Sequence, residues 1–258
     1  MITDTHAHVF WKDFDGDREA VLARARAEGV ERMIIVGTTP ETSRQCFELC
    51  DGQPGLYPTA GVHPHDAEGL SAGILDEIEE LCRRPDCVAV GETGLDYFKE
   101  YSPARDQRRG FRWHLELARE LDKPVIVHCR DANQDTLELL REVPGVRGVM
   151  HCYSMGADEL APYLELGMHI SFSGSVTYPR NEDNREAARR VPADRILVET
   201  DCPFLAPQGK RGKRNEPAYV KLTLEHIAAE RETSADEFAW QTSLNAARLF
   251  GLDGAATG

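Results

Sequence analysis

The chain alternates short apolar runs with longer amphipathic or charged stretches. Each apolar run has a length typical of a β-strand and is followed by polar or glycine-containing residues. Eight such runs occur, at residues 1–8, 32–37, 56–64, 87–93, 124–129, 146–152, 168–174 and 195–201. This pattern predicts eight strands.

Segments with helical character lie between many of these runs and after the last one. The first of them ends at Gly29, which is a typical residue for a helix C-cap. The predicted helical segments are residues 18–29, 105–122, 131–143, 157–167, 216–232 and 235–251. Strands that alternate with helices are typical of a parallel sheet.

Eight alternations in a chain of 258 residues favour an α/β fold of the (β/α)8 TIM-barrel type. A doubly wound sheet of six or seven strands is the structural alternative. The sequence contains neither a linker nor an internal repeat. We therefore expect one barrel domain over residues 1–252, followed by a short flexible tail at 253–258.

Composition limits the possible functions. The net charge is −14, from 30 basic and 44 acidic residues, which excludes a broad basic surface for nucleic acid but allows a local patch. Seven cysteines form no disulfide spacing pattern, so a reducing compartment is expected. The N-terminus reads as a strand rather than as a signal peptide, and no apolar run has the length of a membrane span. We expect a cytoplasmic protein without membrane contact, and nothing indicates an obligate protein partner.

Polar side chains at the ends of the predicted strands carry the first sign of chemistry. His6 and His8 are two residues apart on one strand and therefore point to the same face. In a barrel the carboxyl ends of all strands meet at the active-site face. Other strands end in a histidine or a carboxylate, namely His63, His65, Glu92, His128, His151 and Asp201.

These residue types predict a metal centre. A single histidine or carboxylate at a strand end has an ordinary explanation, as a core histidine or a helix cap, but the whole set at one end of one barrel does not. The predicted ligands are His6, His8, Glu92, His128, His151 and Asp201. They exceed the number that one tetrahedral ion uses, which indicates two divalent ions, with Glu92 as a bridge. Nitrogen and oxygen donors suit zinc, manganese, nickel or magnesium.

Metal-assisted hydrolysis is the reaction class that such a site supports. Asp201 is suited both to bind an ion and to accept a proton from the attacking water. Cys129, Cys152 and Cys202 each follow a predicted ligand directly. The alternation along a strand predicts that these thiols point away from the site and serve packing.

A basic run on the loop after the eighth strand suggests the substrate. Lys210, Arg211, Lys213 and Arg214 are the densest cluster of positive charge in an acidic chain, and Arg130 follows the strand that ends in His128. Cations beside a metal site indicate a phosphate-bearing substrate, although a solvated loop is the ordinary alternative. Rings that could stack on bases are also present after strands, at Tyr97, Phe98, Tyr153, Tyr178 and Phe204.

At this point the motifs resemble the TatD family of metal-dependent hydrolases. The matching segments are DTHAH, GVHPH, GETGLDY, PVIVHCRDA, MHCYS, ISFSGSVTY, VETDCPFLAP, RGKRNEPAYV and NAARLFGL, in order from residue 3 to about residue 252. The resemblance implies a TIM barrel and a metal-dependent deoxyribonuclease that works on single-stranded DNA ends from 3′ to 5′. Cys129 and Cys202 stand where the family pattern often has serine.

The resemblance also implies roles for individual residues. His6 and His8 would bind one ion, His128 and His151 a second, and Glu92 both. Asp201 would complete the site and assist the water, and His63 would lie near the scissile phosphate. Arg214 and Asn215 would help to form the substrate side. Independently of the resemblance, we assign His65, Arg130 and the basic loop to the substrate side as well.

Two other function classes remain open from sequence. An amidohydrolase-like barrel would cleave a small amide, lactone or ester, often with a modified lysine where this chain has Glu92. A binding or scaffold protein with a vestigial site would be expected to have lost ligands, and none of the six is missing.

Overall fold

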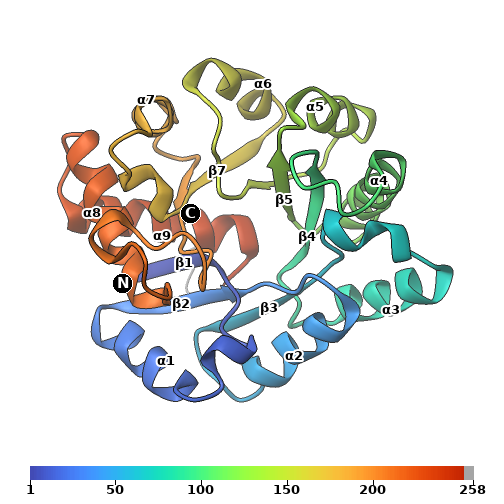
Figure 1. Cartoon of the computed structure of the whole chain (residues 1–258), viewed down its shortest axis with the longest axis horizontal. Coiled ribbons are helices and arrows are strands. Elements are labelled where there is room, and N and C mark those ends of the chain that lie inside the picture. The colour runs from blue at the N-terminus through green and yellow to red at the C-terminus, as the bar shows by residue number, and fades with distance from the viewer. Residues whose placement is uncertain (253–258) are drawn as a thin grey trace.

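The computed structural model describes residues 1–252. Its eight strands form one sheet in the order β1 to β8, and every neighbouring pair is parallel. The helices surround the strands (Figure 1). The strands are β1 (Ile2–Ala7), β2 (Val30–Ile35), β3 (Leu56–Ala60), β4 (Ala89–Asp96), β5 (Val125–Arg130), β6 (Gly148–Met150), β7 (Met168–Phe172) and β8 (Ile196–Val198).

The sheet closes on itself, as a TIM barrel requires. The chain beyond β8 returns to β1, where the Asp201 amide donates to the His6 carbonyl oxygen over 2.9 Å and Ala7 pairs with Cys202 in parallel. The fold prediction of a single (β/α)8 barrel is confirmed. The predicted tail at 253–258 lies outside the described residues.

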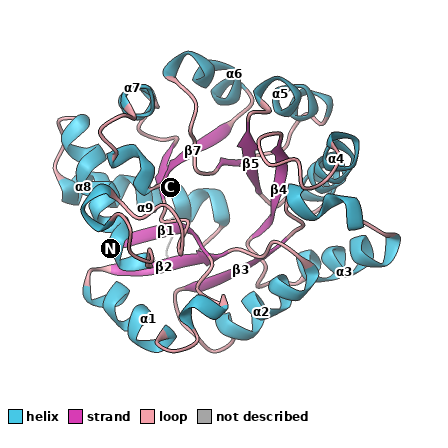
Figure 2. Ribbon diagram, in the orientation of Figure 1, coloured by secondary structure: helices cyan, strands magenta, loops and turns pink. Residues whose placement is uncertain are grey.

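Helices follow the strands around the barrel, as the ribbon coloured by secondary structure shows (Figure 2). They are α1 (Arg18–Ala27), α2 (Pro40–Cys50), α3 (Ala72–Arg83), α4 (Ala104–Glu120), α5 (Asn133–Glu142), α6 (Leu160–Glu165), α7 (Glu182–Arg190), α8 (Val220–Glu230) and α9 (Ala235–Phe250). No helix in residues 1–252 combines the length and apolar character that a membrane crossing requires. The six predicted helical segments are all present, and α2, α3 and α7 are additional.

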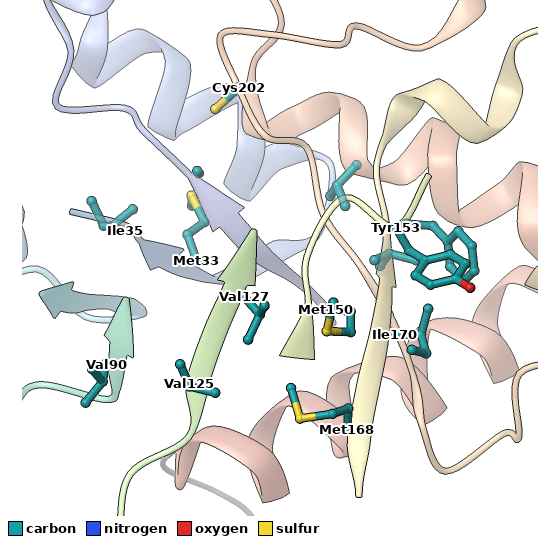
Figure 3. Close-up of a cluster of buried hydrophobic side chains, with 14 of the residues drawn as sticks. Met33, Ile35, Val90, Val125, Val127, Met150, Tyr153, Met168, Ile170 and Cys202 are labelled. Carbon is teal, nitrogen blue, oxygen red and sulfur yellow. The ribbon is translucent and has the colours of Figure 1, made fainter. Parts of the chain in front are cut away.

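Alternation along the strands divides the core into two clusters. Met33, Ile35, Val125 and Val127 belong to the large cluster between strands and helices, part of which Figure 3 shows. The strand residues next to them in sequence have side chains on the other face, and these form a smaller cluster with the end of α9. These residues are Ile34, Val36, Ala89, Ile126, Val149 and Leu197, which pack with Ala246, Ala247, Leu249, Phe250 and Leu252. The smaller cluster therefore occupies the inside of the barrel.

The inward register continues from apolar to polar residues toward the carboxyl ends of the strands. On β5 His128 is two residues beyond the inward Ile126, and after β6 His151 is two beyond Val149. After β8, Glu199 and Asp201 continue from Leu197. The side chains that close the barrel interior at this end are therefore hydrophilic and buried.

Candidate metal centre

The carboxyl ends of the strands open into a cavity of about 770 Å³. Its lining includes residues that lie up to two hundred positions apart in the chain. The predicted site residues in the lining are His8, His63, His65, Glu92, His128, Arg130, His151 and Asp201. His6 is completely buried directly beneath them. The structure thus brings all six predicted metal ligands to one place.

Glu92 lies at the centre of the histidines, and its two carboxylate oxygens face different sets. Oε2 lies 3.3 Å from His6 Nε2 and 3.9 Å from His8 Nε2. Oε1 lies 2.9 Å from His151 Nε2 and 3.1 Å from His128 Nδ1. One carboxylate therefore connects two groups of imidazoles, which is the arrangement expected of a bridging ligand.

Asp201 completes the first group. Its Oδ1 lies 3.5 Å from His8 Nε2 and 3.8 Å from His6 Nε2. Together with Glu92 Oε2, the first group then consists of two imidazole nitrogens and two carboxylate oxygens. The donors around Oε1 are the nitrogens of His128 and His151, with His63 Nε2 at 3.4 Å as a further neighbour.

Hydrogen bonds behind the site hold the imidazoles in place. His8 Nδ1 donates to the Val36 carbonyl oxygen over 2.8 Å. His151 Nδ1 donates to Glu199 Oε1 over 3.2 Å, and His128 Nε2 donates to Asp96 Oδ2 over 3.1 Å. In each ring the other nitrogen is left facing Glu92. Carbonyl or carboxylate support of this kind is the usual outer shell of histidine metal ligands.

Electrostatics keep the central carboxylates ionised. Burial raises the pKa of Glu92, but its interactions with the imidazoles of His151, His63 and His6 outweigh burial and hold it well below its usual range. The pKa of Asp201 is also lowered, because the hydrogen bond to His8 and the nearby imidazoles overcome its burial. Burial lowers the pKa of His63 to about 4, so this ring is neutral near pH 7.

The donor set fits divalent cations. Imidazole nitrogens and carboxylate oxygens meet without a thiolate, and three clusters of metal-ligating atoms occur in the described residues. These clusters are His6 with His8 and Glu92, His63 with Glu92 and His128, and His6 with His151 and Glu199. Two of the polar atoms here, His6 Nδ1 and Glu199 Oε2, are buried without a hydrogen-bond partner. A cation would offset the cost of burying this much unpaired polar surface.

The turn that carries Asp201 is fixed from below by Asp4. Asp201 has a φ of +57°, a left-handed conformation that costs about 1–3 kcal/mol for a residue with a side chain. The completely buried Asp4 accepts hydrogen bonds from the Thr200 amide (2.9 Å) and the Thr200 hydroxyl (2.6 Å). Burial raises the pKa of Asp4 to about 7, although the Thr200 bonds oppose this change.

A close approach between β4 and β5 requires a glycine beside the site. Gly94 has a φ of +140°, and a Cβ there would lie 2.0 Å from the His128 carbonyl oxygen. Any other residue would push β5 away and move His128 relative to Glu92. This explains one of the two glycines in the GETGLDY motif.

The three cysteines next to ligands belong to no metal cluster of the described residues. Cys202 is buried, and Cys129 Sγ accepts a hydrogen bond from the Thr136 hydroxyl over 3.3 Å. Cys152 Sγ lies 3.2 Å from Ser173 Oγ. Cys129 and Cys152 nevertheless contribute to the cavity lining, contrary to the strict alternation argument. The chain turns at Cys152 with a φ of +45°, so strand alternation no longer applies there.

The predicted substrate residues have different surroundings. Arg130 lines the cavity with its guanidinium 3.9 Å from the centre of the Phe98 ring, and His65 lines it with Nε2 2.9 Å from Asp96 Oδ2. Arg211 lies over the ring of Tyr178, another lining residue. Lys210 lies over Tyr219, and Lys213 is exposed on the same loop.

Arg214 and Asn215 lie outside the cavity lining. The Arg214 guanidinium forms two hydrogen bonds with the carboxylate of Asp17, at 2.9 and 2.7 Å, and stacks on Phe14. Asn215 is completely buried and donates to the carbonyl oxygens of Thr200 and Phe204. These contacts join the loop to the barrel.

Sequence reasoning missed the residues that support the ligands. Asp96 is part of the GETGLDY motif, and Glu199 is two residues before Asp201 on the same side of the strand. That spacing is a usable signal for Glu199. Trp11, whose ring stacks on His8 at 4.9 Å between centroids, had no signal in the pattern.

Comparison with known proteins agrees with this geometry. The family model for TatD related DNase matches residues 3–251. The Bacillus subtilis protein named uncharacterized metal-dependent hydrolase YabD is 40% identical over 255 residues, which cover 98% of this chain and 100% of the relative. The 3′-5′ ssDNA/RNA exonuclease TatD of Klebsiella pneumoniae is 38% identical over 249 residues, covering 93% of this chain and 94% of the relative.

A solved structure also indicates similarity to the TatD family. The crystal structure of YJJV, a TatD homologue from Escherichia coli, superimposes with a TM-score of 0.92 at 30% identity, covering 97% of this chain and 98% of that chain. The chain belongs to the TatD related DNase family and is a metal-dependent hydrolase.

Proposed function

We propose that this protein hydrolyses phosphodiester bonds of DNA with two divalent ions, working from 3′ to 5′ on single-stranded ends. The observation that carries the proposal is the position of Glu92, whose two oxygens face separate sets of histidines. The activity named for the Klebsiella relative supports the 3′-to-5′ direction of cleavage and the single-stranded substrate. Its name also includes RNA, so RNA belongs in the test.

The residues around Glu92 have distinct roles in this proposal. His6, His8 and Asp201 would hold the first ion, His128 and His151 would hold the second, and Glu92 would be shared. When bound, two such ions lower the pKa of a water molecule and stabilise the charge on attacking and leaving oxygens. Nitrogen and oxygen donors suit zinc, manganese, nickel or magnesium, and these are the metals to test.

Asp201 is the proposed proton acceptor for the attacking water. It lies at the cavity floor, and its lowered pKa keeps it ionised near neutral pH. His63 is the proposed donor to the scissile phosphate. The His65 amide donates to His63 Nδ1 over 3.1 Å, which leaves the proton on Nε2, the nitrogen that faces the site. Arg130 and Lys99 in the cavity lining provide positive charge for a phosphate.

The experiment is a comparison of Asp201→Asn with the wild type after loading with each metal. We expect the variant to fold and to lose at least about 10³-fold in turnover, because general-base contributions reach this size. Asp66→Asn is the matched control, because Asp66 lines the same cavity outside the ligand set. The substrates are 3′- and 5′-labelled single-stranded DNA, duplex DNA, RNA and small esters.

The outcomes separate the proposal from its rivals. Stepwise loss of nucleotides from the 3′ end of single-stranded DNA supports it. Near-normal turnover of Asp201→Asn would contradict the role of this carboxylate. Hydrolysis of small esters or lactones without cleavage of nucleic acid would instead identify an amidohydrolase-like enzyme.

A further inference from the structure

A second, smaller cavity of about 360 Å³ adjoins the metal cavity. Tyr178 and Asn181 line both cavities, so the two spaces are direct neighbours. The remaining lining of the smaller cavity consists of Pro179, Arg180, Gln208 and Arg211. It contains two guanidinium groups and no carboxylate, in a chain whose net charge is −14.

The two arginines of this cavity differ in their ion pairing from the arginines of the neighbouring helix α7. Arg185, Arg189 and Arg190 on α7 each form an ion pair with a glutamate. Within residues 1–252, Arg180 and Arg211 have no carboxylate partner. Arg180 is exposed, and the Arg211 guanidinium rests on the Tyr178 ring at 4.6 Å. Their charge is therefore available to an anionic ligand.

The backbone around these arginines is held in place. Arg185 donates to the carbonyl oxygens of Tyr178 (2.6 Å) and Pro179 (3.1 Å), which fixes the segment that carries Arg180. The Tyr178 hydroxyl donates to the Ala206 carbonyl oxygen over 2.9 Å.

A further bond joins the second segment to the first. The Gln208 amide donates to the Thr177 hydroxyl over 2.8 Å, close to Arg211 in the chain. The two segments that supply the guanidinium groups are thus tied to each other. The backbone of a site of this kind loses little freedom when a ligand binds.

We infer that this cavity binds a second phosphate of the substrate strand, next to the phosphodiester at the metal centre. Planar guanidinium groups bind phosphate oxygens in pairs, and Arg211 on an aromatic ring is oriented for this. The inference rests on the proposed function, since it places a neighbouring phosphate of the same strand. It predicts that the enzyme prefers substrates with at least two phosphates over a dinucleoside with one.

The first test measures how kcat/KM depends on substrate length. The substrates are thymidine oligomers of two, three and four nucleosides without terminal phosphates. For the wild type we expect kcat/KM to rise about tenfold or more from two nucleosides to three, the size of a charge-assisted contact. The double variant Arg180→Ala/Arg211→Ala should lose this rise and retain the wild-type rate on the dimer.

Arg26→Ala/Arg119→Ala is the matched control. Arg26 and Arg119 are exposed arginines in the last turns of α1 and α4, and their removal changes the net charge by two, as in the double variant, without touching either cavity. This control should retain the full length dependence. A double variant that also retains it would overturn the inference, as would a wild type whose kcat/KM does not rise with length.

The second test is independent of catalysis. Binding of fluorescent tetrathymidylate in the presence of EDTA is measured by anisotropy at several salt concentrations. Loss of one phosphate contact should reduce the slope of log K against log salt by about 0.7 for a single strand. An unchanged slope in the double variant would refute the second phosphate site. If the wild type cleaves no oligomer, the proposed function fails, and the salt slope still decides the binding inference.

Discussion

Replacement of Asn215 by alanine separates a structural role from contact with substrate. Its motif places this residue on the substrate side, whereas the structure buries it completely. Asn215 Nδ2 donates to the carbonyl oxygens of Thr200 (2.9 Å) and Phe204 (2.6 Å), and Oδ1 accepts from the Glu216 amide (3.0 Å). These bonds connect the start of the loop, at Thr200 and Phe204, to its end at Glu216.

The magnitude follows from the number of bonds that alanine removes. A typical hydrogen bond contributes roughly 1 kcal/mol to stability, and each buried partner that alanine leaves behind loses its hydrogen bond to Asn215. We expect Asn215→Ala to lower the free energy of unfolding by about 3 kcal/mol. Urea denaturation followed by circular dichroism measures this change. Turnover should fall as well, because Asp201 is less firmly held, while KM should change little.

Two further variants complete the test. Asn215→Asp keeps the shape and the bond from the Glu216 amide, but it places a carboxylate against two carbonyl oxygens, so it should destabilise at least as much. Lys213→Ala, on the exposed part of the same loop, should leave the unfolding free energy within about 0.5 kcal/mol of wild type. A raised KM with unchanged stability in Asn215→Ala would refute the structural role and favour direct contact with substrate.

Three other predictions follow from the contacts. Glu199→Gln should lower kcat/KM about 10- to 100-fold with an unchanged circular dichroism spectrum, because Glu199 orients His151; a wild-type rate would contradict this. Burial lowers the pKa of His114 to about 4, so below pH 6.5 the unfolded chain binds a proton that the folded protein does not. The free energy of unfolding should therefore fall by about 2 kcal/mol between pH 7.5 and pH 5 because of this residue alone. In urea titrations, His114→Gln should not show this contribution to the pH dependence. EDTA should lower the calorimetric Tm of the wild type and added zinc, manganese or magnesium should restore it, whereas Glu92→Gln should respond weakly.

The sequence was sufficient for the barrel because strand positions depend on a simple pattern. All eight apolar runs overlap a strand, although β6 and β8 have only three residues each. The missed helices α2 and α7 bury few large apolar side chains, so they lack an apolar stripe. α3 was detectable, because Ile78 and Cys82 are buried on one face and Ser71 caps its start.

The candidate ligands were accessible from sequence for a related reason. Once the strands of a barrel are assigned, topology brings their carboxyl ends together, and the residues there need no further information to be placed. The supporting carboxylates were harder to identify. Glu199 and Asp96 act through His151 and His128, which are 48 and 32 residues away. The spacing of Glu199 from Asp201 indicates its face of the strand, but no local pattern shows which histidine either carboxylate supports.

The basic loop shows most clearly what the sequence pattern omits. Arg211 and Arg214 belong to one run of charge, and sequence reasoning assigned both to phosphate. Arg214 is paired with Asp17, which is 197 residues away, so most of its charge is already compensated inside the protein. Arg211 has only an aromatic ring beneath it and lines a cavity that adjoins the metal cavity. A cation therefore becomes a candidate for substrate binding through the absence of an internal partner, and this depends on the tertiary structure rather than on the local density of charge.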